Sequence, residues 1–142
     1  MNKTGFQITQ PAVINFLDQH YQDSLLRSLE KNDFKCYVLD GSKIHDKKSF
    51  LNEIGSSLLD VAPIAGWDEF GSLYKEWLIR ADQNQSALIW PHVQQMLNGN
   101  LDELIEITDI LTVITRKLYS QDKVYLNFFL GEGPNFPKPA KL

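Results

Sequence analysis

The chain has 142 residues, of which 43% are hydrophobic and 23% charged, as in an ordinary folded domain and unlike a disordered chain. Its apolar runs are only a handful of residues long, whereas a membrane span needs about 20, and its N-terminus lacks the apolar core of a secretion signal. These features predict a cytoplasmic protein with no membrane contact. The net charge of −4 argues against direct nucleic-acid binding and favours a basic partner.

The acidic residues are concentrated in the middle of the chain. Residues 60–110 carry nine acids and two bases, a net charge of −7, whereas residues 1–59 are balanced and residues 111–142 sum to +3. Such an asymmetry predicts an acidic face built from the middle segment.

The first 33 residues are predicted to form an N-terminal helical extension. Proline is favoured in the first helical turn, so Thr9-Gln10-Pro11 indicates a helix start, and apolar residues then recur at mainly helical spacing up to Glu30. One or two helices are expected here.

The segment 34–130 is predicted to be an α/β domain, because strand-like runs alternate with amphipathic helical patterns. Strands joined by helical crossovers pair in parallel, so the expected architecture is a small three-stranded parallel sheet flanked by helices. The tail, residues 131–142, is rich in Pro and Gly and is predicted to run extended and loosely held. The expected elements are strands over 34–39, 86–90 and 122–130, helices over 46–58, 68–77 and 100–118, and a short helical turn over 93–97.

The sequence carries no complete catalytic or metal-binding motif. The three histidines lack metal-ligand spacing, and the single cysteine, Cys36, lies in an apolar run typical of a buried thiol. No nucleophile or phosphate-binding signature occurs. We therefore predict no catalytic residue, no metal and no cofactor. Two carboxylates held close together can act as general acid and base, as in a small hydrolase. The pairs Asp68 with Glu69 and Glu103 with Glu106 keep this hypothesis open beside those of a binding protein.

A protein-binding surface is predicted on the helix that begins near Asp68. Phe70, Tyr74 and Trp77 fit its buried face, whereas Trp67 precedes the helix and is interpreted either as core or as a contact anchor. Acids displayed beside an aromatic anchor suit a basic cleft. The predicted partner-binding residues are Trp67, Asp68, Glu69, Ser72, Lys75 and Glu76.

The order of these segments resembles the barstar family of small intracellular ribonuclease inhibitors. The resemblance covers residues 34–130 and is carried by YVLDGSKI (37–44), Phe50, GWDEFGSLY (66–74), ALIW (87–90) and the last helix and strand through Phe128. It implies a three-stranded parallel sheet with helices and an inhibitor or immunity protein, monomeric when free, that blocks a secreted or delivered ribonuclease or related nuclease toxin. Family members present the second helix and its preceding loop to the enzyme's cationic active site, where carboxylates stand in for RNA phosphate.

The chain departs from the family at three positions. Gly71 and Lys75 stand where family members carry aspartates, and Arg116 lies near the position of an acidic contact residue in the last helix. Asp68, Glu69 and Glu76 are nearby acids that could serve instead. The alternative hypothesis is an interaction module of the same fold without inhibitor activity.

Overall fold

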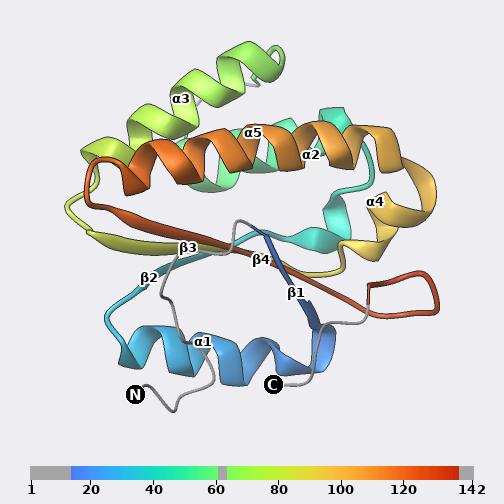
Figure 1. Ribbon diagram of the computed structural model, residues 1–142. Coiled ribbons are helices and arrows are strands. Elements are labelled where there is room, and N and C mark those ends of the chain that lie inside the picture. The colour runs from blue at the N-terminus through green and yellow to red at the C-terminus, as the bar shows by residue number, and fades with distance from the viewer. Residues whose placement is uncertain (1–13, 61–63, 138–142) are drawn as a thin grey trace.

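Four parallel strands form a central sheet in the order β1-β4-β3-β2. In the computed structural model, which describes residues 14–60 and 64–137, both faces of this sheet carry helices (Figure 1). The two central strands are buried along almost their whole length, as expected of a parallel sheet that is covered on both faces. The strands are β1 (Asn15–Asp18), β2 (Lys35–Val38), β3 (Gln85–Trp90) and β4 (Val124–Gly131).

The helices divide between the two faces of the sheet. Figure 1 shows the first helix, in blue, below the sheet and the later helices above it. The chain crosses the sheet once from β1 to β2 and then returns through β3 to β4, and right-handed crossovers in opposite directions lie on opposite faces. The lower helix is α1 (Gln22–Lys31), and the upper helices are α2 (Lys47–Glu53), α3 (Trp67–Arg80), α4 (Gln94–Gly99) and α5 (Leu101–Tyr119).

Alternate residues of the central strands supply two separate cores. In β3, Leu88 and Trp90 face the four upper helices, whereas Ala87 and Ile89 face α1. This is the period-two alternation of a strand. The predicted α/β class is confirmed, and each helix and strand expected between residues 34 and 131 is present, with α2 continuing as a π-helix over Ile54–Leu59.

The prediction of three strands and an N-terminal helical extension was wrong in part. Residues Asn15–Asp18 form a fourth strand, β1, which pairs in parallel with β4. A 3-10 turn over Gln19–Tyr21 follows it, and the α-helix begins at Gln22. Phe16 packs with the upper core and Leu17 with the lower one, so these neighbours face opposite sides. Pairing with β1 also provides hydrogen-bond partners for the backbone N–H and C=O groups along the edge of β4 that faces away from β3. The predicted helix start at residues 9–11 lies outside the described residues.

The beginning of the C-terminal tail is held against the core. Phe136 is buried, and its ring meets that of Phe16 edge-on with 5.9 Å between centroids. The expectation of a loosely held tail is therefore wrong as far as Phe136. The free energy gained by burying the aromatic ring exceeds the conformational entropy lost when this Pro-rich segment is ordered. Residues 138–142 of the predicted tail lie outside the described residues.

None of the helices in the described ranges combines the length and apolarity needed to cross a bilayer.

Replacing Leu17 with alanine tests whether β1 belongs to the core. Leu17 is 4% exposed, and truncating a buried leucine costs about 2–5 kcal/mol because apolar burial is lost and a cavity remains. We expect L17A to lower the free energy of unfolding by that amount in urea titrations followed by circular dichroism. The control, V113A at an exposed position of α5, should change it by about 0.5 kcal/mol or less. An L17A midpoint equal to the wild type's would contradict a structural role for β1.

Candidate functional site

Helix α3 carries all six predicted binding residues, and its buried face fixes the direction in which they point. Phe70, Tyr74 and Leu78 are buried at successive turns. The Tyr74 hydroxyl lies 2.6 Å from the Tyr125 hydroxyl of β4, and burial raises the pKa of both phenols. Trp77, predicted to be buried, is only half-buried and packs against Tyr37, with 4.7 Å between ring centroids. The polar residues of α3 are thereby directed away from the sheet.

A groove of about 370 Å³ runs between α3 and α5. Four of the six predicted residues line it, together with a glycine and four residues of α5 that the prediction did not include. The structure therefore brings most of the predicted surface together, but around a groove and not on a convex helix face. The lining residues are Trp67, Asp68, Gly71, Ser72 and Lys75 from α3 and Asp109, Ile110, Val113 and Ile114 from α5.

Trp67 combines the two roles considered for it. Its half-buried ring packs against Phe50 and Phe70, with 6.3 Å between centroids in each case, while the ammonium of Lys47 lies 4.8 Å from the ring centroid. Its indole Nε1 is buried without a hydrogen-bond partner among the described residues. Trp67 thus closes the upper core and forms part of the groove wall at once.

The remaining two predicted residues, Glu69 and Glu76, are not among the groove's lining. Glu69 Oε1 accepts a 2.6 Å hydrogen bond from the backbone N–H of Ala65, so it holds the loop that leads into α3. Glu76 forms an exposed ion pair with Arg80 at 3.7 Å. Both carboxylates therefore have partners within the chain.

Sequence reasoning missed the contribution of α5 to the site. Asp109 was counted among the acids of the middle segment, but a single sequence does not show that α5 lies beside α3. The available signal was Val113, an apolar residue off the buried stripe of α5, whose side chain is 67% exposed. Arg116, expected near a contact position, is exposed but does not line the groove.

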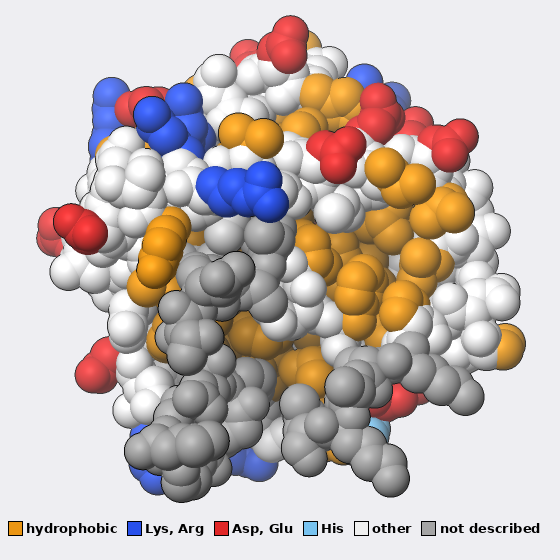
Figure 2. Space-filling model, in the orientation of Figure 1, with side chains coloured by type: hydrophobic (Ala, Val, Ile, Leu, Met, Phe, Trp, Pro, Cys, Tyr) orange, Lys and Arg blue, Asp and Glu red, His pale blue; other side chains and the backbone are white. Residues whose placement is uncertain are grey.

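The charges near the groove are unevenly distributed. Asp68 and Asp109 are exposed, and neither forms an ion pair with another of the described residues. Figure 2 shows acidic side chains gathered at the upper right, toward the beginning of α5, and basic side chains at the upper left, toward the ends of α3 and α5. This face of the molecule is therefore acidic toward one end and basic toward the other.

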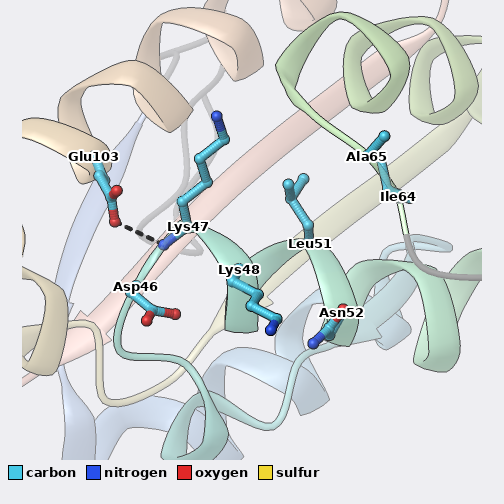
Figure 3. Close-up of a pocket in the computed structure, with 8 residues that line it drawn as sticks. All are labelled: Asp46, Lys47, Lys48, Leu51, Asn52, Ile64, Ala65 and Glu103. Carbon is cyan, nitrogen blue, oxygen red and sulfur yellow. Dashed lines mark hydrogen bonds between the residues drawn. The ribbon is translucent and has the colours of Figure 1, made fainter.

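A second hollow, of about 450 Å³, lies where α2 begins. Figure 3 shows the carboxylate of Glu103 turned toward the start of α2, where Oε1 accepts a 2.7 Å hydrogen bond from the backbone N–H of Lys47. Asp46 caps the same helix, and hydrogen bonds from the side chain and backbone of Ser49 lower the pKa of its carboxyl. These acids serve the fold by joining α5 to α2 and by starting α2.

The carboxylate pairs considered for hydrolysis are engaged in the same way. One member of each pair, Glu69 or Glu103, accepts a backbone N–H. Among residues 14–60 and 64–137, no cluster of three or more His, Cys, Asp or Glu side chains could hold a metal ion. The groove itself presents two carboxylates, one ammonium group and an apolar wall to solvent.

The chain matches no protein-family model and no curated protein.

Substitutions at two glycines compare an open position, Gly71 at the groove floor, with a closed one, Gly41 beside Pro91. A Cβ on Gly71 would meet only Ile110 Cγ2 at 3.8 Å, so we expect G71A to raise the free energy of unfolding by about 0.5–1 kcal/mol through better helix propensity. A Cβ on Gly41 would lie 1.6 Å from the Pro91 carbonyl oxygen, and G41A should lower stability by about 1–3 kcal/mol. Chemical denaturation measures both values. Destabilisation by G71A would show that the floor is filled.

The environment of Cys36 predicts an unreactive thiol. Burial, with a smaller contribution from Glu30, raises its pKa from 9.0 to about 11. Because the thiolate is the reactive species, alkylation by iodoacetamide at pH 8 should be about 100-fold slower than that of free cysteine. Unfolding in guanidinium should restore the ordinary rate. Rapid labelling of the native protein would contradict this account.

Proposed function

We propose that this protein is a barstar-like inhibitor or immunity protein that binds the basic active site of a ribonuclease or related nuclease toxin. The observation that carries the proposal is the groove between α3 and α5, where four predicted binding residues meet and Asp68 and Asp109 have no cationic partner among the described residues. A basic cleft would supply the missing positive charges. Binding, and not catalysis, is the proposed activity.

The fold supports this proposal. From β2 to β4, the described chain has three parallel strands that are adjacent in chain order, with two helices in each crossover on one face of the sheet. This is the kind of architecture that the barstar resemblance implies. The helix and loop that the family presents to its target correspond to α3 and the residues before it, and α3 forms one side of the groove.

The departures at Gly71 and Lys75 indicate the kind of target. Both line the groove, so the surface contains a gap and a positive charge where family members carry carboxylates. A nuclease cleft that fits this chain would therefore differ in shape and charge from the one that barstar blocks. The same two residues favour the alternative, an interaction module of this fold that inhibits no nuclease.

Charge reversal at the groove tests the proposed function. The double variant D68K/D109K removes two acids that make no ion pair within the described chain and leaves Glu69 in its structural role. We expect it to weaken binding to basic nucleases that the wild type inhibits by about ten-fold or more, mainly through a slower association rate at low salt. Surface plasmon resonance and an RNA-cleavage assay measure the two effects.

The matched control places the same change on the other side of the sheet. D23K/E30K also replaces two exposed acids with lysines, but on α1. Equal loss in both variants would indicate only a general effect of net charge. If the wild type neither binds nor inhibits a broad panel of basic nucleases, the interaction module becomes the better account.

A further inference from the structure

The groove between α3 and α5 is more than an acidic surface, because most of its wall is apolar. Ile110, Val113 and Ile114 line one side and the Trp67 ring lines the other. Gly71 has no side chain, so the groove floor beside Ile110 is left open at this position. Val113 is 67% exposed, the largest value among the exposed large hydrophobic residues described. A water-filled apolar groove of this kind gains free energy when an apolar side chain enters it.

The groove also has a direction. Helix α3 leads the chain back to the start of β3, and α5 leads it back to the start of β4. Because β3 and β4 are parallel, the two helices run in the same general direction, as Figure 1 shows. Asp68 is the second residue of α3, whereas Asp109 lies near the middle of α5. On each helix the acid comes at the start of the stretch that lines the groove, 67–75 or 109–114, and Lys75 ends the stretch on α3. One end of the groove is therefore acidic, and Lys75 marks the other end.

From this geometry we propose that the groove receives an aromatic side chain of a partner protein, with a basic residue beside it that meets Asp68 and Asp109. An aromatic ring is the natural occupant because it places a large apolar area between two helices at a low cost in conformational entropy, and such residues dominate the centres of protein interfaces. The inference rests on the binding surface of the proposed function and adds the chemistry of what enters it.

Charge complementarity favours a foreign partner over a second copy of this chain. In a symmetric dimer the two acids of one groove would meet the groove of the other copy, which offers two acids and only one base, Lys75. The interface would then bring four acids together with two bases, and this excess of like charge opposes association. A segment that carries bases next to the aromatic anchor avoids this repulsion.

Three tripeptide amides test the two parts of the proposal separately. Acetylated Lys-Trp-Lys carries both features, Glu-Trp-Glu reverses the charge, and Lys-Ser-Lys lacks the ring. Titration of ¹⁵N-labelled full-length protein followed by NMR should show millimolar binding of Lys-Trp-Lys, with amide shifts confined to residues 67–75 and 109–114. Under the same conditions the other two peptides should bind at least about five-fold more weakly.

Variants then localise the effect. G71L should fill the groove and abolish the shifts, and R27L, which adds a leucine on α1, should leave them unchanged. V113S removes part of the apolar wall at an exposed position, so it remains informative if G71L fails to fold. Neutralising either acid, in D68N or D109N, should weaken binding about two- to five-fold.

The outcomes separate this inference from the proposed function. Shifts spread over all acidic residues, equal binding of Lys-Ser-Lys, or binding unaffected by both G71L and V113S would overturn the groove assignment even if a nuclease is inhibited. Conversely, groove-specific binding of Lys-Trp-Lys by a protein that inhibits no nuclease would support the inference and refute the nuclease target.

Discussion

The fold depends on the burial of β3 and β4 on both faces. Every residue of these strands except the first is buried, so neither face can be left to water. The upper face is covered by the helices that connect β2, β3 and β4, whereas within residues 14–60 and 64–137 the helix on the lower face is α1. Without β1 and α1, the side chains of Ile89 and Phe128 would be exposed. The N-terminal segment is thus part of the core, and α3 and α5 lie on the opposite side, free to form a binding surface.

Local patterns were sufficient for the elements between residues 34 and 131, because each shows its hydrophobic periodicity or its end signals within its own segment. Residues 15–18 lack such a signal. The apolar spacing of Phe16 and Leu17 fits both a helix and a short strand. The segment becomes a strand because β4 offers it backbone hydrogen-bond partners along one edge. Phe136 illustrates the same limit, since its burial depends on Phe16, a residue 120 positions away. Long-range pairing, and not propensity, settled both cases.

The candidate site was predictable along one helix but not across two. The exposed face of α3 follows from the spacing of Phe70 and Tyr74, so its outward residues could be named, although Leu78 and not Trp77 is the buried residue of the next turn. That Asp109 and Val113 complete the surface depends on how α3 and α5 pack, which no local pattern contains. Glu69 shows a different limit: its charge suggested recognition, and the sequence did not reveal that its carboxylate also accepts a hydrogen bond from the backbone of Ala65.

The hydrogen bond between Tyr74 and Tyr125 has a consequence for how this surface can diversify. Because the two buried phenols join α3 to β4, the rotation of α3 about its own axis is set from inside the protein. Substitutions at the outward positions 68, 72 and 75 can then accumulate without turning the helix. On the proposed function, the residues that fix the fold are therefore separate from those that would meet a partner, so a change of target would need only a few surface substitutions and would leave the core intact.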